Sequence, residues 1–170
     1  MLSPELPANE IDRIATLQRL QLLDTPPDPV FNELIEYAAS ALEVPHALIS
    51  IVDETRQWFK ASSLPGMDQT GRDISFCAHA ILNPTELMEV EDALLDARFW
   101  DNPLVIGEPH IRFYAGAPIV LSNGHAIGTV CVIDTKPHAL TEEQAMILRA
   151  LAQIAAGEIE RQYPPEPLAH

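Results

Sequence analysis

The sequence predicts an α+β domain, in which an antiparallel sheet carries helices on one face. Two pairs of strands joined by short turns, and helices gathered at the two ends of the chain, lead to this expectation. Antiparallel neighbours can be joined by tight turns, whereas parallel strands need long crossover connections. The order of the expected elements lacks strand–helix alternation and therefore argues against a doubly wound parallel sheet.

Two helices are expected near the N-terminus. The first spans residues 10–23, with Asn9 as its N-cap and one amphipathic stripe formed by Ile11, Ile14, Leu17, Leu20 and Leu23. The proline-rich turn at 25–29 ends it. Asp28 then caps a second helix that has Pro29 at its first position and runs to about Leu42. The residues expected to face inward are Phe31, Leu34, Ile35, Ala38 and Leu42.

A third long helix is expected at the other end of the chain. Thr141 and Gln144 fit a capping box, and the helix runs to about Gln162. Its apolar stripe consists of Ile147, Leu148, Leu151, Ile154, Ala155 and Ile159. Residues 1–8 and the proline-rich residues 163–170 are expected to be flexible, which leaves 9–162 as one domain.

The middle of the chain is expected to form strands. Residues 46–53 and 57–61 pair as a hairpin, and 87–92 is a short strand. Residues 113–121 and 125–134 surround Asn123-Gly124, a strong hairpin signal because both residues tolerate positive φ. A short helix capped by Ser75 spans 75–82, and 93–109 is expected to be a loop.

Composition limits the class of protein. A chain of 170 residues with 47% hydrophobic residues fits one domain of about 150 residues, and no apolar run approaches the roughly 18 residues of a membrane span. A net charge of −15 with ten Lys and Arg disfavours nucleic acid and anionic membranes as partners. The N-terminus lacks the pattern of a secretory signal, and two cysteines are too few for a disulfide framework. The cytoplasm is the expected location.

Metal and phosphate sites are not expected. The chain has neither of the glycine-rich phosphate-binding patterns. Cys77 and His79, with Cys131 as a third candidate, lack the paired spacing of zinc sites, and residues two apart on a helix point to different sides. The expectation is that Cys77 packs as a small apolar residue while His79 forms a hydrogen bond or lines a pocket.

A thiol function is the alternative for the same segment. Cys77 falls in the first turn of the expected short helix, where the helix dipole lowers a thiol pKa, and His79 could assist it. Cys131 alternates with Val130 and Val132, so it should face the opposite side of its strand. Redox sensing through either cysteine, or a reductase reaction through Cys77, therefore stays open.

Polar and aromatic residues suggest a small-molecule pocket. Asp96, Arg98 and Asp101 lie in an acidic stretch that is either a solvated loop or a lid held by ion pairs. Trp58, Phe99 and Tyr114 are candidate walls. Arg112, together with Arg56, Arg72 and Arg98, could form a local basic site despite the acidic balance of the chain.

Several ordered motifs resemble one family. They are Arg72-Asp-Ile-Ser-Phe-Cys-Ala-His-Ala-Ile, Val90-Glu-Asp-Ala-Leu-Leu-Asp-Ala-Arg-Phe, Asp101-Asn-Pro-Leu-Val, Ile111-Arg-Phe-Tyr-Ala-Gly-Ala-Pro-Ile and Ile127-Gly-Thr-Val-Cys-Val-Ile-Asp. Together with the leading residues 10–27, they make residues 9–162 resemble the GAF domain family. The resemblance is to the modules that precede histidine kinase or diguanylate cyclase domains in bacteria.

The resemblance implies a sheet of five or six strands with terminal helices on one face and a ligand pocket on the other. Family members bind cyclic nucleotides, tetrapyrroles, haem or small metabolites, and many dimerise through their terminal helices. The cyclic-nucleotide motif is absent here and the surroundings of Cys77 do not predict a bilin, so the ligand stays unidentified and no cofactor is assigned. The candidate ligand-binding residues are Trp58, Phe76, Cys77, His79, Asp96, Arg98, Phe99, Asp101, Arg112 and Tyr114.

The leading hypothesis is a non-catalytic sensory domain that binds a small molecule and signals through its terminal helices. Its expected partners are a second copy of the chain and a kinase or cyclase output domain. A redox sensor or free methionine sulfoxide reductase using Cys77 is the first alternative. A dimerisation module without a ligand is the second. The proline-rich tail favours a natural end of the chain after the last helix.

Overall fold

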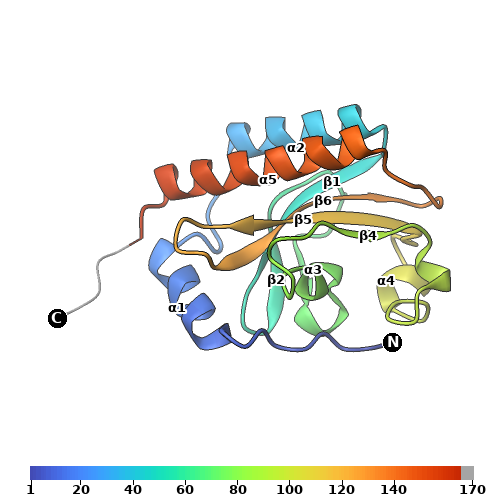
Figure 1. The fold of residues 1–170 in the computed structure, drawn as a ribbon, viewed down its shortest axis with the longest axis horizontal. Coiled ribbons are helices and arrows are strands. Elements are labelled where there is room, and N and C mark those ends of the chain that lie inside the picture. The colour runs from blue at the N-terminus through green and yellow to red at the C-terminus, as the bar shows by residue number, and fades with distance from the viewer. Residues whose placement is uncertain (166–170) are drawn as a thin grey trace.

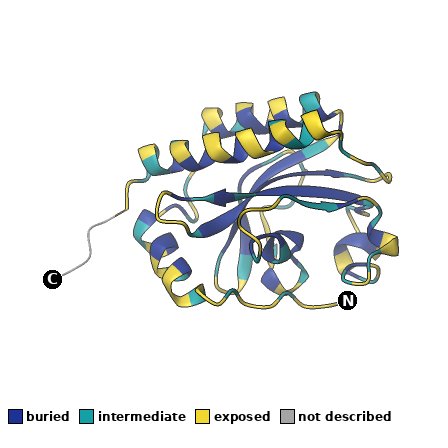
Figure 2. Ribbon diagram, in the orientation of Figure 1, coloured by how far each residue is buried: buried dark blue, intermediate teal, exposed yellow. Residues whose placement is uncertain are grey.

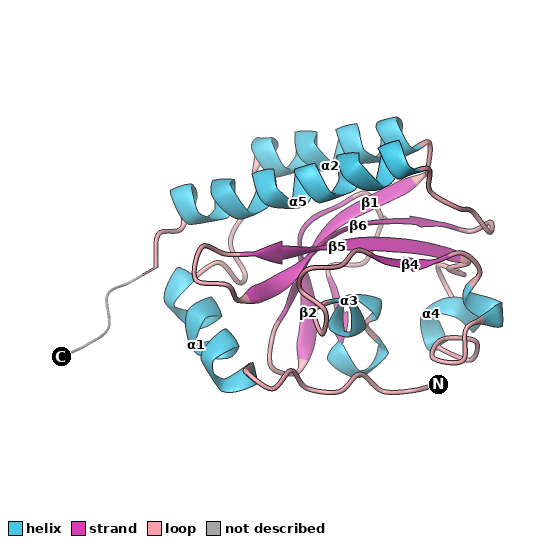
Figure 3. Ribbon diagram, viewed as in Figure 1, coloured by secondary structure: helices cyan, strands magenta, loops and turns pink. Residues whose placement is uncertain are grey.

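The computed structural model describes residues 1–165, and the core of the molecule is a six-stranded antiparallel sheet. The strand order is β3-β2-β1-β6-β5-β4. Two long helices cover one face, and short helices and loops cover the other (Figures 1 and 3). The expected α+β class and the absence of parallel pairing in this sheet are confirmed.

Five of the six strands fall where the sequence predicts strands. They are β1 (His46–Val52), β2 (Arg56–Ser62), β4 (Met88–Val90), β5 (Phe113–Val120) and β6 (Ala126–Asp134). The sixth, β3 (Gln69–Gly71), is a three-residue edge strand paired with the start of β2. Its polar residues show no alternation, which is why the sequence does not indicate it.

The long helices on the sheet are α2 (Pro29–Leu42) and α5 (Glu142–Gln162), which lie side by side (Figure 1). Both N-caps are confirmed. The Asp28 carboxylate accepts a hydrogen bond of 2.8 Å from the Val30 backbone N–H, and Thr141 and Gln144 form the capping box. The five inward residues expected on α2 are buried. On α5 the expectation fails for Ile154, which is 58% exposed.

The first helix, α1 (Glu10–Leu20), lies apart from α2 and α5 at one end of the sheet (Figure 1). It ends earlier than expected, and the Asn9 side chain makes no capping hydrogen bond. Leu17 and Leu20 are buried as expected, but Ile11 is 86% exposed. The buried stripe is instead completed by Arg13 and Thr16, so the apolar spacing predicted the buried face only in part.

A buried ion network ties α1 to the sheet and to the loop below it. Arg13, only 1% exposed, donates to the Val52 backbone carbonyl at 2.7 Å. The Glu10 carboxylate accepts hydrogen bonds from both Arg13 and Arg72. Arg72 also donates to the Asp53 carbonyl at 3.0 Å. Burial acts to raise the pKa of Glu10, but the two guanidinium groups outweigh it and lower that pKa to about 2.

The segment 93–109, expected to be a loop, contains two short helices. These are η2 (Ala93–Leu95), a single 3-10 turn, and α4 (Pro103–Ile106). Asp92 caps the first and Asn102 caps the second. On the same side lie η1 (Arg72–Ile74) and α3 (Phe76–Ala80), where Ser75 caps α3 as expected.

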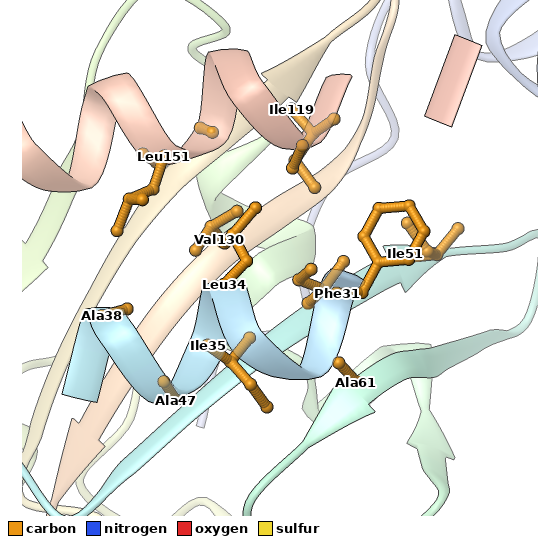
Figure 4. Close-up of a cluster of buried hydrophobic side chains, with 14 of the residues drawn as sticks. Phe31, Leu34, Ile35, Ala38, Ala47, Ile51, Ala61, Ile119, Val130 and Leu151 are labelled. Carbon is orange, nitrogen blue, oxygen red and sulfur yellow. The ribbon is translucent and has the colours of Figure 1, made fainter. Parts of the chain in front are cut away.

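Alternation along the strands divides the interior into two cores. Ile49, Ile51, Val130 and Val132 face the helices and pack against α2 and α5 residues such as Phe31 (Figure 4). The intervening residues face the short helices and form a second core. Cys131 belongs to the second core and the flanking valines to the first, as the sequence predicts. Figure 2 shows the strands between these layers as largely buried.

A β-bulge interrupts this alternation in β2, and a tight turn joins β5 to β6. At the β1–β2 pair, Ser50 opposes Phe59 and Ile49 opposes Ala61, so Lys60 is an extra residue in a β-bulge. The expected β5–β6 hairpin is present, and its turn closes by a hydrogen bond of 2.8 Å from Gly124 N–H to the Leu121 carbonyl. Within the turn only Gly124 has positive φ, at 88°, rather than both turn residues.

The chain ends are placed as follows. Residues 1–8 run beneath the short helices, and Leu2 exchanges hydrogen bonds with Arg98 and His79. The flexibility expected for residues 1–8 stays a prediction. Tyr163, assigned from the sequence to the tail, is partly buried and accepts a hydrogen bond from Lys60. Residues 166–170 of the expected tail lie outside the described residues. Within residues 1–165, no helix has the length and hydrophobicity to cross a bilayer.

Candidate ligand and thiol site

A small cavity lies between the sheet and the segments that cover its second face. Its volume is about 30 Å³, room for roughly one or two water molecules. The sheet side is formed by residues of β1, β2, β5 and β6, including Tyr114 and Cys131. The outer side is formed by Leu104 of α4 and by connecting segments, which contribute Leu64, Met67, Pro109 and Ile111. The lining is almost entirely apolar.

Polar groups converge on the sulfur atom of Cys77 at the base of this cavity. The Tyr114 hydroxyl donates to Cys77 Sγ at 3.2 Å, and the Thr129 hydroxyl donates at 3.0 Å. Cys131 Sγ lies 3.9 Å from Cys77 Sγ, and both thiols are free and buried. These four residues, Cys77, Tyr114, Thr129 and Cys131, are called the thiol cluster below.

The pKa values of the two cysteines in the thiol cluster are shifted in opposite directions. Burial acts to raise the pKa of Cys77, but hydrogen bonds from Cys131, Thr129 and Tyr114 outweigh it and lower that pKa. The interaction with Cys77 and burial raise the pKa of Cys131 well above its usual value. Burial and the nearby Cys77 charge also raise the pKa of Tyr114. Cys77 is therefore the thiol that ionises first.

A buried amide network borders the thiol cluster. The Gln57 side-chain carbonyl accepts hydrogen bonds from Ser50 at 2.9 Å and from Ser75 at 2.7 Å. The Gln57 amide donates to the Thr70 hydroxyl at 2.7 Å. The network joins β1, β2, β3 and the N-cap of α3, so it fixes the helix that carries Cys77.

Stacked aromatic rings form the wall beside Cys77. Phe76 and Phe99 stack with ring centroids 4.0 Å apart, and Tyr114 is tilted against Phe76 at 5.2 Å. His79 contacts the edge of Phe99 and its Nε2 lies 3.2 Å from the Leu2 carbonyl. Burial lowers the pKa of His79. His79 thus faces away from the sulfur of Cys77, and the two do not form a nucleophile–base pair.

Asp96 and Arg98 form the expected ion pair, with Arg98 Nη2 2.9 Å from Asp96 Oδ2. Hydrogen bonds from Arg98 lower the pKa of Asp96 against the effect of burial. Arg98 also stacks over the Phe99 ring at 4.9 Å and, with His79 and Glu89, lines a surface hollow of about 210 Å³. The pair therefore lies over the aromatic wall and outside the cavity.

Three candidate residues lie elsewhere. Trp58 packs in the core that faces α2 and α5, because its position on β2 has the opposite parity to Phe59. Asp101 pairs with the N-terminal amine of Met1 and not with Arg98. Arg112 donates to the Val105 and Ile111 carbonyls at 2.9 and 3.0 Å, so it supports the segment around α4. Neither the expected wall at Trp58 nor the expected three-residue lid is formed.

Other residues of the site escape the sequence patterns. Ser50, Gln57 and Thr129 are polar and fully or almost fully buried. Ser50 and Thr129 lie inside otherwise apolar strands, whereas Gln57 lies between Arg56 and Trp58. A single polar residue in an apolar strand could have indicated Ser50 and Thr129, because a buried polar group needs a hydrogen-bonding partner. Among residues 1–165, no group of three His, Cys, Asp or Glu side chains is placed to hold a metal ion.

Fold and site together define an antiparallel α+β domain with a helical layer on one face and a small enclosed core site on the other. The family model for the GAF domain matches residues 26–159. The chain therefore belongs to the GAF domain family, as its motifs predict.

One relative is a cyclic di-GMP phosphodiesterase of Pseudomonas aeruginosa, 46% identical over 160 residues. This alignment covers 94% of the present chain but only 27% of that enzyme, so the chain spans about a quarter of the relative's length.

Solved structures show the same fold at lower identity. The GAF domain of a phosphoenolpyruvate-protein phosphotransferase from Coxiella burnetii has a TM-score of 0.65 and 16% identity, covering 88% of this chain and 95% of that one. A domain of a putative two-component sensor histidine kinase from Sinorhizobium meliloti has a TM-score of 0.59 and 19% identity, covering 78% and 90%. These similarities establish the fold alone.

Proposed function

We propose that this chain is a non-catalytic regulatory module of a bacterial, cytoplasmic signalling protein, which senses a small molecule on the cavity face and controls an output domain. The similarity to one part of a cyclic di-GMP phosphodiesterase supports this assignment and favours an output that acts on a cyclic dinucleotide. A kinase or cyclase output fits the same role.

The observation that carries the proposal is the connection between the two faces through β2. Phe59 lines the cavity, and the next residue, Lys60, points to the helical face. Lys60 Nζ donates to the Thr25 hydroxyl, the Pro26 carbonyl and the Tyr163 hydroxyl at 2.7–2.8 Å. A shift of β2 at the cavity would therefore change the attachment of the end of α5, from which a signal would pass onward.

The cavity has to enlarge before it admits a metabolite. At about 30 Å³ it is far below the roughly 300 Å³ of ordinary ligand pockets. Its outer wall consists of α4 and connecting segments, which open at a lower free energy than sheet strands. Ligand binding would then select an open conformation from a minor population.

Native mass spectrometry of the protein purified from its own host tests the proposal. A co-purifying small molecule is the expected result. Leu104→Phe should abolish its retention because the larger ring fills the cavity, whereas Leu94→Phe, the same change at an exposed site, should not. Absence of any bound molecule, together with no thermal shift from a metabolite panel, would refute ligand sensing.

A homodimer through α2 and α5 is a second part of the proposal. The outer surface of these helices exposes Met146 and Ile154 on α5 and Tyr37 and Val30 on α2. Leu148 on α5 is fully buried against the sheet, so a substitution there would disturb the core and could not test the dimer interface. Sedimentation of Ile154→Glu should show loss of dimer relative to the wild type, while Ile11→Glu, on exposed α1, should not. A wild-type monomer at high concentration would exclude this interface.

The reductase alternative is less well supported by the site. Free methionine sulfoxide is an amino-acid-sized substrate, which the present cavity cannot hold without opening. In addition, His79 does not reach Cys77 to act as its base. An assay for turnover of free methionine sulfoxide should give none; measurable turnover would replace the non-catalytic proposal.

A further inference from the structure

The two buried thiols lie close together although no role in ligand sensing requires it. Cys77 comes from α3 and Cys131 from the centre of β6, with 3.9 Å between their sulfur atoms. A disulfide has an S–S length of about 2.05 Å, so the sulfurs need to approach by roughly 2 Å. A change of side-chain torsion and a small shift of α3, a helix of one and a half turns, could provide this movement.

The surroundings of the two thiols favour Cys77 as the nucleophile and Cys131 as the thiol that resolves the oxidised Cys77. Thr129 and Tyr114 both direct a hydroxyl at Cys77 Sγ, and a thiolate is stabilised by such donors. Cys131 keeps its proton because a charge there would lie beside that of Cys77. Tyr114 lies on β5 and Thr129 on β6, and these two strands pair with each other, so both donors are held by the sheet itself.

Access to the sulfurs is through the small cavity, since both cysteines line it. Room for roughly one or two water molecules suits an oxidant of two heavy atoms. A peptide disulfide such as oxidised glutathione would have to displace the outer wall at Leu64 and Met67. The size of the cavity therefore favours hydrogen peroxide.

We propose that Cys77 and Cys131 form a peroxide-oxidisable dithiol that closes to an intramolecular disulfide between α3 and β6. The Cys77 thiolate attacks one peroxide oxygen; an S–O bond forms, the O–O bond breaks, and the released hydroxide takes a proton from solvent. Cys131 then attacks the Cys77 sulfur, the S–S bond forms, and the hydroxide leaving Cys77 takes the Cys131 proton. Two thiols lose two electrons and two protons, and one peroxide becomes two waters. This site goes beyond the ligand-sensing proposal and does not depend on it.

The reaction of the native wild-type protein with stoichiometric hydrogen peroxide gives the primary test. After denaturation, neither thiol should react with an alkylating reagent, and the intact mass should fall by two hydrogen atoms. A reductant should restore both thiols, and peptide mapping should link Cys77 to Cys131. Two thiols that remain free, or an intermolecular disulfide, would overturn the proposal.

Single cysteine variants test the order of the two steps. With Cys131→Ser, oxidation should stop at a Cys77 sulfenic acid that dimedone labels. With Cys77→Ser, Cys131 should stay unlabelled under the same conditions, because burial still favours its protonated thiol and it lacks the Tyr114 hydroxyl donor that Cys77 has. Equal labelling of the two variants would contradict the assignment of Cys77 as the nucleophile.

The hydroxyl donors and the cavity size are tested separately. Thr129→Val keeps the side-chain shape but removes a donor. At a pH below the Cys77 pKa it should slow disulfide formation by up to about tenfold, because one pKa unit changes the thiolate fraction tenfold there. Thr85→Val, the same change at an exposed site, should leave the rate unchanged. Oxidised glutathione should react more slowly than peroxide; an equal rate would refute access through the cavity.

Discussion

The two faces of the sheet are formed by the same strands, but different interactions stabilise them. The helical face is filled by aliphatic and aromatic side chains from β1, β5, β6, α2 and α5, with Lys60 at its edge. The opposite face contains the thiol cluster, the Gln57 network and a small cavity. Apolar packing secures the first face, whereas the second depends on the geometry of buried hydrogen bonds. A face that depends on such geometry can respond to a ligand or an oxidant with smaller changes in packing.

The largest expected effect comes from deleting an aromatic ring on each face. Phe31→Ala should lower the free energy of unfolding by about 4 kcal/mol, because Phe31 is fully buried between α2 and the sheet. Phe76→Ala should lower it by about 3 kcal/mol, since Phe76 borders a cavity and its surroundings can collapse. Urea denaturation of both variants measures the difference. Equal losses, or a larger loss for Phe76→Ala, would contradict the expected difference between the two faces.

The ion network at the end of the sheet should give the next largest effect. Glu10→Gln leaves Arg13 and Arg72 without their counterion and should lower stability at neutral pH by about 2 kcal/mol. The pKa of Glu10 is lowered in the folded state, so its contribution is complete above the ordinary value of 4.5 and disappears as pH falls towards about 2. Denaturation from pH 7 to pH 2 should therefore show the wild type and variant converging in acid. A constant difference would contradict the lowered pKa.

A smaller effect is expected inside the thiol cluster. Tyr114→Phe removes a hydroxyl donor from Cys77 and should raise the thiol pKa by about one unit, with a loss of stability of about 1 kcal/mol. Thiolate absorbance in the ultraviolet, followed across a pH titration, measures the shift. The Cys77→Ser variant identifies the part of the signal that belongs to Cys77. An unchanged titration would show that Tyr114 does not stabilise the thiolate.

The smallest effect is expected outside both cores. Ile11→Ala should change stability by less than about 0.5 kcal/mol, because the side chain is largely exposed on α1. Leu17→Ala on the same helix should cost about 3 kcal/mol, since Leu17 is buried in the core. Thermal denaturation separates the two. A large loss at Ile11 would indicate that this residue is covered by another molecule in solution.

The same contrast explains what the sequence could predict. Periodicity identified the inward residues of α2, and cap chemistry identified Asp28, Ser75 and Thr141, because these signals depend on neighbours in the chain. Strand parity also placed Cys131 opposite Val130. The wrong assignments have tertiary causes. Trp58 was expected at the cavity but lies on the helical face, because alternation along a strand does not say which face of the sheet the helices cover.

The candidate site was less predictable than the fold. The meeting of Cys77, Thr129 and Cys131 requires a short helix to cross β6, and no local pattern specifies that crossing. Arg112 was a candidate for ligand binding, but its guanidinium donates to backbone carbonyls near α4. Charge in a sequence indicates a capacity for pairing, and only the fold decides whether a ligand or the protein itself uses it.

The bulge at Lys60 has a consequence for how such a domain can change over time. Because Lys60 is an extra residue opposite β1, removing it would leave Ala61 on the helical face and the strand pairing in register. The sheet would tolerate the deletion, but the end of α5 would lose the amine that binds Tyr163. Insertion or deletion of one residue could thus change the attachment of α5 while leaving the cavity face unchanged. Related chains are expected to vary in length at this position more readily than in the residues of the thiol cluster.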